Sequence, residues 1–400
     1  MAGLTFRNVY KQYGRTKVQQ IFDADKSVTL DRDRRDVDAT VRRVASSTAA
    51  PYAVDNFSLE CPNGTFVGIL GPSGCGKTTS LRMVAGLEEI TRGDILIGDR
   101  VVNNLHPKDR DIGLAFEDYA LYPPLNVFDN IAFNLRAKKM PEDEVRRRVL
   151  ELAPLMKVED LLDAKPAGLS GGQKQRVNIA RALVRQPSVL LLDEPLSHLD
   201  GKMRQILRTE IKRIHNRIKC TTVLVTHDQL EAMSLSDRIA IMKDGRLQQF
   251  GTPLEVYDNP VNVFVAGFIG EPPMNLARVG IVDDGRDRFF LFPAKGIRIR
   301  VPGKYAASVF AGDEVILGVR PTDVLINPDD PKAAAVPIAV FENLGDEKRI
   351  SIEVGPEEYL TLVTEDEKRY RPGDEIKLVF RETKTHIFDK ITGDRILGKE

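Results

Sequence analysis

The larger, N-terminal part of the chain alternates short apolar runs with longer segments of helical periodicity. Short apolar runs bounded by polar residues are typical of buried parallel strands, whereas apolar residues three or four positions apart predict helices. The expected strands cover residues 4–13, 52–59, 66–70, 188–192 and 221–226, and the expected helices cover residues 78–86, 130–185 and 203–217. Strands that alternate with helices predict a doubly wound α/β domain.

The pattern changes after about residue 270, where Glu271-Pro272-Pro273 interrupts the chain. Short strand-like runs follow, separated by Gly, Pro and Asp turns, and helical periodicity is nearly absent. We therefore expect an α/β domain over residues 1–270 and an all-β barrel or sandwich over residues 271–400. Residues 15–50 interrupt the first domain with a segment dense in charge, which predicts an inserted hairpin or loop.

Composition narrows the range of partners. Lys plus Arg and Asp plus Glu both number 58, so the formal net charge is zero, and the absence of a sustained basic stripe argues against binding to nucleic acid. The three cysteines are far apart and lack metal-ligand spacing, which favours reduced thiols. No apolar run approaches the roughly 20 residues that span a bilayer, and the N-terminus lacks a secretory pattern. We expect any membrane role to depend on partner subunits.

A glycine-rich sequence between an expected strand and an expected helix matches the phosphate-binding P-loop. Its residues are Gly71, Pro72, Ser73, Gly74, Cys75, Gly76, Lys77 and Thr78, and Thr79 follows them. The glycines let backbone N–H groups converge on phosphate oxygens, and the helix N-terminus adds its positive dipole end. We expect Lys77 to reach the β- and γ-phosphates of a nucleotide and Thr78 to bind Mg²⁺.

Two carboxylates follow the apolar run at residues 188–192. The carboxyl end of a parallel strand faces the ligand crevice of an α/β domain. Asp193 is therefore suited to bind Mg²⁺, and Glu194 is suited to orient the attacking water. An acidic pair at a strand end is common, and a solvated turn is the alternative interpretation.

A third sequence, just upstream of that strand, separates this chain from other P-loop proteins. It runs Leu169, Ser170, Gly171, Gly172, Gln173, Lys174, Gln175 and Arg176. Ser170 is a good N-cap, and the free N–H groups of the first helical turn form an anion site. The whole string resembles the signature of ABC ATPases. In that family, Ser170, Gly171, Gly172 and Gln173 would contact ATP held by a second subunit.

Other elements of the ABC family fall at matching positions in the same order. Residues 197–200, which end in Asp200, resemble the D-loop that joins the two nucleotide sites of a dimer. His227 resembles the switch histidine that touches the γ-phosphate, and Tyr13 is positioned like the aromatic residue that stacks on adenine. The resemblance implies ATP and Mg²⁺ as cofactors and catalytic roles for Lys77, Glu194 and His227. The remaining histidines have no such support: His106, His198, His215 and His386.

One position departs from the family pattern. Residues 114–123 resemble the Q-loop of carbohydrate importers, where glutamine is usual, but Glu117 stands at that position. A carboxylate can bind Mg²⁺, but it cannot donate a hydrogen bond and it adds negative charge near the γ-phosphate. We predict an active but altered site that turns over more slowly than a Glu117→Gln variant. A heterodimer with a second ATPase is one arrangement that would tolerate this site.

The resemblance covers nearly the whole chain except residues 15–50. Residues 248–257 and 264–270 resemble the exit from the ATPase domain of maltose-type importers. Residues 317–321 and 342–345 resemble the transport-associated OB domain that follows it. These matches imply a P-loop ATPase domain with a helical subdomain at about 118–185, followed by an OB-like β domain. They also imply the ATP-hydrolysing subunit of a bacterial importer for a sugar, polyol or glycerol phosphate.

The family also implies partners. Two ATPase subunits, as a homodimer or a heterodimer, would bind transmembrane permeases at the cytoplasmic face of the inner membrane, and an extracytoplasmic solute-binding protein would act indirectly. The loop after Glu117 is where the family contacts the permease. A weakly hydrolysing regulatory subunit paired with a second ATPase is the alternative function. A chromosome-maintenance ATPase would need a long coiled coil between Lys77 and Ser170, and a translation-type ABC protein would need a second P-loop.

Overall fold

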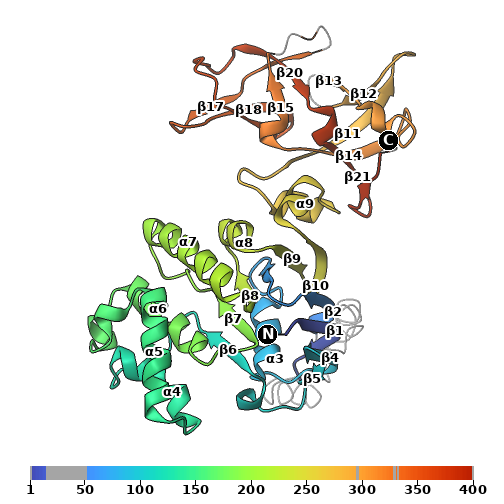
Figure 1. Ribbon diagram of the computed structural model, residues 1–400. Coiled ribbons are helices and arrows are strands. Elements are labelled where there is room, and N and C mark those ends of the chain that lie inside the picture. The colour runs from blue at the N-terminus through green and yellow to red at the C-terminus, as the bar shows by residue number, and fades with distance from the viewer. Residues whose placement is uncertain (1, 15–51, 294–296, 328–329, 331–332, 399–400) are drawn as a thin grey trace, which may run out of the picture. The chain divides into compact units, whose positions relative to one another are not determined.

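The computed structural model of the chain describes residues 2–14, 52–293, 297–327, 330 and 333–398. These residues belong to two compact units, Met1–Phe250 and Gly251–Glu400 (Figure 1). The first unit combines helices with two sheets and the second is built mainly of strands, which confirms the predicted fold class. The expected insertion at residues 15–50 lies outside the described residues.

The central sheet of the first unit carries the candidate site at the ends of its strands. Its six strands lie in the order β10, β9, β3, β8, β7, β6, and β9, β3, β8, β7 and β6 pair in parallel. Their bounds are β3 (Phe66–Leu70), β6 (Ile112–Ala115), β7 (Val189–Asp193), β8 (Thr221–Thr226), β9 (Arg238–Lys243) and β10 (Arg246–Gly251). β3 and β8 are buried along their whole length, because both faces of a parallel sheet are covered.

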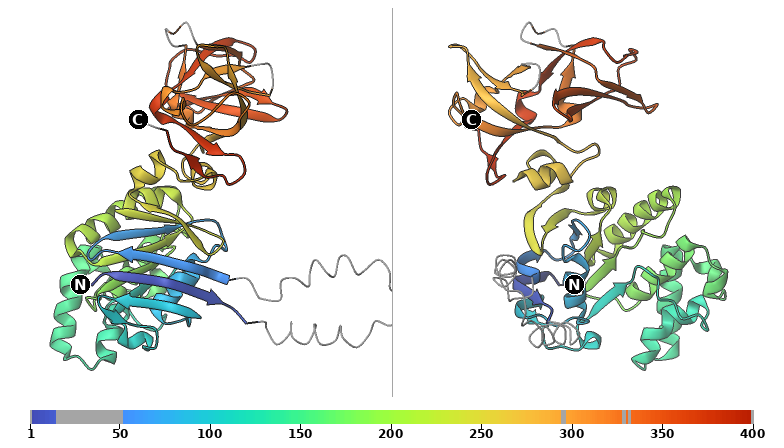
Figure 2. Two further views of the ribbon diagram at one scale, coloured as in Figure 1. Left: turned by 90° about the vertical axis from the view of Figure 1, so that its right-hand side faces the viewer. Right: turned by 180° about the vertical axis from the view of Figure 1, so that it is seen from behind.

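A second, antiparallel sheet has the strand order β2, β1, β4, β5. Its strands are β1 (Leu4–Gln12), β2 (Tyr52–Cys61), β4 (Arg92–Ile97) and β5 (Arg100–Val101), and Figure 2 shows β1 and β2 side by side. Phe6 and Phe57 meet edge to face with ring centroids 5.1 Å apart. They share one apolar core with Ile69 of the central sheet and Leu81 of helix α3 (Lys77–Ala85), so this sheet is fixed against the phosphate loop.

The helices of the first unit pack on the central sheet. The predicted helical subdomain contains α4 (Val127–Ala137), α5 (Glu142–Met156) and α6 (Gly171–Leu183). α7 (Gly201–Ile218) and α8 (Gln229–Leu235) complete the unit. Ile131, Val149, Val177 and Leu207 join these helices to Phe66 in a second apolar core. This core fixes the helices against the central sheet.

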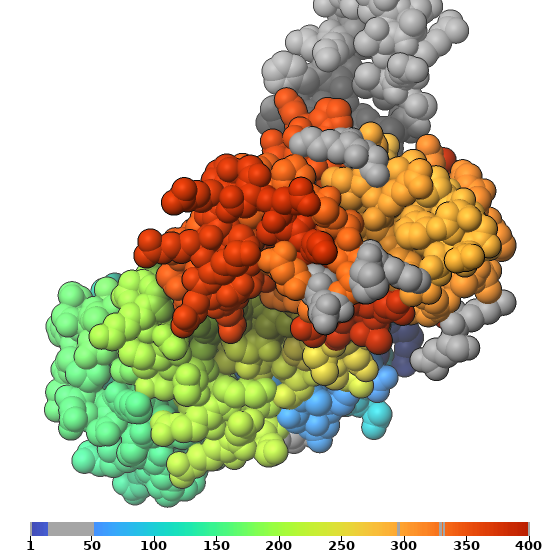
Figure 3. All heavy atoms as spheres, turned by 90° about the horizontal axis from the view of Figure 1, so that it is seen from above, coloured from blue at the N-terminus to red at the C-terminus, as the bar shows by residue number. Residues whose placement is uncertain are grey.

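The second unit contains three sheets. Their orders are β13-β12-β11-β14-β21-β22, β15-β20-β16 and β17-β18-β19. The strands are β11 (Asn275–Asp283), β12 (Arg288–Leu291), β13 (Arg298–Arg300), β14 (Glu314–Val319), β15 (Val324–Ile326), β16 (Ala334–Pro337), β17 (Val340–Asn343), β18 (Lys348–Gly355), β19 (Glu358–Thr364), β20 (Glu375–Phe380), β21 (Thr385–Asp389) and β22 (Arg395–Ile396). Alternate side chains of these strands fill one apolar core, and the unit forms a packed body (Figure 3, orange to red).

Two short helices before residue 270 lie in the second compact unit, and the expected domain boundary at residue 270 stays a prediction. The second unit begins at Gly251 and includes α9 (Pro253–Asp258) and α10 (Val263–Phe268). The buried Arg320 guanidinium donates to the backbone oxygens of Tyr257, Ala266 and Ile269, and it stacks on the Tyr257 ring with its carbon 4.0 Å from the centroid. These bonds attach both helices to the β unit, and no composition change at residue 250 marks them.

Candidate nucleotide-binding site

The phosphate loop forms where β3 ends and α3 begins. Gly76 has φ +103°, and a Cβ there would lie 2.3 Å from a backbone oxygen, so only glycine fits. Lys77 is 5% exposed, and its Nζ donates to the carbonyl oxygens of Gly71 at 2.8 Å and Pro72 at 2.9 Å. The loop therefore holds its ammonium group against its own backbone.

The hydroxyl and thiol side chains of this loop differ in their exposure to solvent. Ser73 and Thr78 are exposed, so their hydroxyls can reach a phosphate or a metal ion. The Thr79 Oγ1 lies 3.5 Å from the Tyr13 Oη, which places the exposed Tyr13 ring beside the loop. The stacking of Tyr13 on adenine stays a prediction. Cys75 is buried, and burial raises the pKa of its thiol, so this cysteine packs the loop and is unsuited to act as a nucleophile.

The two predicted carboxylates end β7 and face the loop. Burial raises the pKa of the Asp193 carboxyl group to about 6. That value also includes the negative charges of Glu194 and Glu117, which raise the pKa, and the positive charges of Arg82 and Lys77, which lower it. These groups are therefore close enough to act on one another, and they surround a carboxylate that a cation would stabilise.

Glu194 and His227 come together across two strand ends. Glu194 has a left-handed backbone with φ +43°, and its N–H donates to the Val225 oxygen of β8 at 2.9 Å. The Glu194 Oε2 lies 2.9 Å from Nδ1 of His227, which directly follows β8. A strained non-glycine residue persists only where its surroundings hold it, and such residues gather at functional sites. The fold thus brings together Lys77, Asp193, Glu194 and His227.

The donor set suits Mg²⁺. In the described ranges, no group of three or more His, Cys, Asp or Glu residues could by itself hold a metal ion. Mg²⁺ usually keeps several waters and binds one or two carboxylates together with substrate phosphates. The exposed Thr78 hydroxyl and the carboxylates of Asp193 and Glu117 therefore fit an ion that a nucleotide also holds.

Glu117 contacts the predicted D-loop, which the sequence analysis missed. The Ser197 Oγ donates to the Glu117 Oε1 at 3.3 Å, and Nε2 of His198 lies 3.5 Å from the same oxygen. His198 matched no family position, yet it is a histidine beside the one unusual carboxylate of the site. The two loops lie 80 residues apart in the chain, so periodicity and motif spacing gave no signal for this contact.

The signature and D-loop residues cap two helices. The Ser170 N–H donates to the Gln173 Oε1 at 2.8 Å and the Gln173 N–H to the Ser170 Oγ at 3.4 Å, so the predicted cap of α6 is present as a capping box. Asp200 accepts from the Met203 N–H at 2.9 Å and caps α7. The expected contact of Ser170, Gly171, Gly172 and Gln173 with ATP of a second subunit stays a prediction.

Buried polar side chains of α6 shape the loop after Glu117. The Asn178 amide donates to the Phe116 oxygen at 2.8 Å, and the Arg181 guanidinium donates to the Tyr119 oxygen at 2.8 Å. Tyr119 and Ala120 both have positive φ values, of 63° and 46°. No motif in the sequence marks Asn178 and Arg181, because their positions match an ordinary helix that follows the signature.

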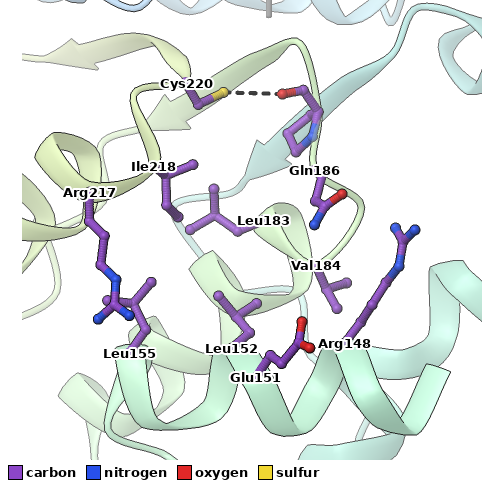
Figure 4. Close-up of a pocket in the computed structure, with 11 residues that line it drawn as sticks. Arg148, Glu151, Leu152, Leu155, Leu183, Val184, Gln186, Arg217, Ile218 and Cys220 are labelled. Carbon is purple, nitrogen blue, oxygen red and sulfur yellow. Dashed lines mark hydrogen bonds between the residues drawn. The ribbon is translucent and has the colours of Figure 1, made fainter. Parts of the chain in front are cut away.

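A separate hollow of about 440 Å³ lies between the C-terminal ends of α6 and α7 and helix α5. Figure 4 shows Leu152, Leu155 and Leu183 on its apolar surface, with Arg148 and Arg217 at opposite sides. The Cys220 thiol at its edge donates to the Pro187 oxygen at 3.2 Å. None of the predicted nucleotide-binding residues lines this hollow.

None of the helices in the described ranges has both the length and the apolar character that crossing a membrane requires.

The phosphate loop on a parallel sheet, with a carboxylate pair and a histidine at neighbouring strand ends, defines a P-loop nucleotide-hydrolysing domain. Three family models match the chain: ABC transporter over residues 54–197, MalK OB fold domain over residues 270–324 and TOBE domain over residues 317–388. In structure, the first unit resembles the dimeric bacterial ABC transporter cassette MJ0796. That likeness has a TM-score of 0.50 and 30% identity, and it covers 62% of this chain and 98% of that one.

Curated relatives match over most of the chain. The trehalose/maltose import ATP-binding protein MalK of Thermococcus litoralis is 47% identical, with 86% of this chain and 95% of the relative covered. The oligosaccharides import ATP-binding protein MsmX of Bacillus subtilis is 45% identical, with the same two coverages of 86% and 95%. The sn-glycerol-3-phosphate import ATP-binding protein UgpC of Bordetella bronchiseptica is 45% identical, with 74% of this chain and 80% of the relative covered. The chain therefore belongs to the ABC transporter family, as an ATP-hydrolysing subunit of the importer type.

Proposed function

We propose that ATP hydrolysis by this chain drives the uptake of a sugar, polyol or glycerol phosphate through partner permeases. The observation that carries the proposal is the approach of Glu194 and His227 to 2.9 Å beside the phosphate loop. The solute class is supported by relatives whose names specify trehalose/maltose, oligosaccharides and sn-glycerol-3-phosphate.

Each site residue has a role that its chemistry fits. Lys77 would neutralise charge on the β- and γ-phosphates, and Glu194 would orient the attacking water. His227, which Glu194 holds, would contact the γ-phosphate. Thr78, Asp193 and Glu117 would hold Mg²⁺, which supplies charge neutralisation for the phosphates. Tyr13 would stack on the adenine.

The site would be completed by a second ATPase subunit. The capped N-terminus of α6 presents free N–H groups, which favour an anion such as the γ-phosphate of ATP held by the other subunit. Asp200 and its loop would contact that subunit. The dimer would close around ATP and open after hydrolysis, and the permeases would change conformation with these two states.

A groove beside the loop after Glu117 is suited to a permease helix. It has a volume of about 290 Å³ and is lined by residues that include Leu87, Leu114, Tyr122 and Arg181. Leu87 and Tyr122 are exposed, and the Tyr122 ring lies 4.5 Å from the exposed Phe133 ring. Exposed apolar side chains that gather around a groove mark an interaction site. This contact would hold the chain at the cytoplasmic face of the bacterial inner membrane.

The test is to purify the tagged chain from its own membranes in mild detergent and to measure ATP hydrolysis by the complex. We expect two permease subunits to co-purify, and we expect hydrolysis to be stimulated by the extracytoplasmic solute-binding protein loaded with its sugar, polyol or glycerol phosphate. Glu194→Gln is the matched control, and it should lower kcat by at least about 100-fold while the same subunits co-purify. If no integral membrane protein co-purifies under conditions that preserve a control transporter, the importer function is wrong.

The cluster of Glu117, Asp193 and Glu194 favours a second candidate, a weakly hydrolysing subunit paired with another ATPase. Like charges around one phosphate site weaken the binding of an anionic substrate. A second, different ATPase in the purified complex would support this candidate, whereas this chain as the sole ATPase would oppose it.

A further inference from the structure

The His227 side chain is mostly exposed, with 58% of its surface accessible, so packing does not hold its ring in place. Its direction toward Glu194 must therefore come from the backbone of the turn between β8 and α8. The residues on either side of His227 in this turn are Thr226, which is buried, and Asp228.

A buried hydrogen-bond chain fixes that turn. The Thr226 Oγ1 donates to the Glu231 Oε2 at 2.8 Å, and it accepts from the Asp228 N–H at 3.0 Å. The Asp228 Oδ1 in turn accepts from the Glu231 N–H at 3.1 Å and caps α8. Both neighbours of His227 are thus tied to Glu231, one through its side chain and the other through its backbone.

Burial of the Glu231 carboxyl group at this position costs folding free energy. It is 2% exposed, and burial raises the pKa of its carboxyl group to about 7. The hydrogen bond from Thr226 lowers this pKa and the nearby charge of Asp228 raises it, whereas the charges of Arg204 and His227 lower it. Burying a carboxyl group costs stability unless hydrogen bonds compensate, and an apolar side chain would fill the same space at lower cost. Its presence calls for a role other than packing.

We propose that Glu231 is a positioning residue for ATP hydrolysis, because its carboxylate holds the Thr226 hydroxyl and thereby fixes the turn that aims His227 at Glu194. This inference rests on the proposed function of the site. A glutamine at position 231 can accept the same hydrogen bond through its amide oxygen, whereas an alanine cannot. The role of Glu231 is therefore separable from its charge.

Arg204 extends the same network toward the D-loop. Its guanidinium donates to the Leu199 oxygen at 3.0 Å and the Ser197 oxygen at 3.4 Å, and it lies 3.7 Å from the Asp228 carboxylate. The turn that carries His227 is therefore connected to the loop that contains Asp200. A displacement of this loop by a second subunit would act on the same turn.

The test compares Glu231→Ala with Glu231→Gln in the complete permease complex. Because the side-chain hydrogen bond of Glu231 goes to Thr226 and not to the phosphate loop, we expect Glu231→Ala to lower kcat by about tenfold or more with KM for ATP changed less than about threefold. Glu231→Gln should keep kcat within about threefold of the wild type. Leu230→Ala, a change of the neighbouring and 61% exposed residue, is the matched control and should keep wild-type kcat.

A second pair of variants covers the case in which Glu231→Ala does not fold. Thr226→Val removes the hydroxyl and should reproduce the loss of kcat, whereas Thr226→Ser keeps it and should restore activity. Wild-type kcat in Glu231→Ala or Thr226→Val, or an equal loss in both members of a pair, overturns the proposal.

His227→Ala distinguishes the positioning role of Glu231 from the proposed function of the site. If His227→Ala abolishes hydrolysis while Glu231→Ala is fully active, the proposed function stands and the positioning role is wrong. A wild-type complex without hydrolysis overturns both.

Discussion

At the scale of single residues, the unusual Glu117 has two polar neighbours in the predicted D-loop. Its carboxylate accepts from Ser197 and lies 3.5 Å from Nε2 of His198. A protonated His198 would offset part of the charge that Glu117 adds to the site, although an exposed pair contributes little by itself. The two residues are therefore treated as a pair, because the His198 ring lies within reach of the Glu117 carboxylate.

We expect Glu117→Gln to raise kcat by about threefold or more, because the amide removes a negative charge beside the γ-phosphate. His198→Asn should slow the wild-type site but have little effect once residue 117 is glutamine. Steady-state kinetics of both single variants and the double variant, at saturating Mg²⁺, measure this coupling. Equal or faster wild-type turnover relative to Glu117→Gln would contradict the prediction, as would additive effects.

The raised pKa of Glu231 predicts how the free energy of unfolding depends on pH. Its pKa rises from 4.5 in the unfolded chain to about 7 in the folded chain, so the folded state prefers the protonated form. This group therefore favours folding below pH 4.5, and its contribution is lost progressively as pH rises to about 7. Above that pH, Glu231→Gln should be more stable than the wild type, by up to about 3 kcal/mol.

The measurement is urea unfolding of both proteins at pH 5 and pH 8, followed by circular dichroism because the chain contains no tryptophan. The variant's advantage should grow from the lower to the higher pH. Other carboxyl groups, among them Asp193, shift both proteins alike, so only the difference between them is informative. A constant difference would contradict the raised pKa.

At the scale of elements, the two short helices α9 and α10 show how a single side chain assigns an element to a unit. Their pattern resembles the exit from an ATPase domain, and the sequence placed them with the first domain. Arg320 is 2% exposed and donates to the backbone of both helical segments, so they belong to the β unit. Backbone acceptors carry no sequence signal, so the sequence could not predict these contacts, and the boundary at residue 270 stays a prediction.

A fragment of residues 251–400 should therefore be more stable than a fragment of residues 271–400. The shorter fragment removes the Tyr257 and Ile269 oxygens that Arg320 bonds and uncovers Met274 and Phe388, which pack with Ala266, so we expect a loss of about 1–3 kcal/mol. Thermal unfolding of the two fragments measures the difference. Arg320→Ala in the longer fragment should reproduce part of the loss, and equal midpoints for the unsubstituted fragments would refute the assignment.

At the scale of the whole molecule, local sequence patterns were enough to predict several strands, the phosphate loop and one helix cap. The strands β1, β3, β7 and β8 were predicted because apolar runs must be buried and alternation has the period of a strand. The phosphate loop and the cap at Ser170 were predicted because both depend on residues adjacent in the chain. The comparisons confirm the ABC family and the two-part fold that these motifs indicated.

Only the tertiary structure decided the contacts between distant segments. The pairing of Glu117 with His198, the turn held by Thr226 and Glu231, and the capture of α9 and α10 by Arg320 all join loops or backbone groups across the fold. A hydrogen bond to a backbone oxygen leaves no mark on the acceptor's side chain, and a loop contact has no periodicity. The sequence by itself thus determined which chemistry is present, because catalytic groups are side chains, and the fold decided what holds that chemistry in position.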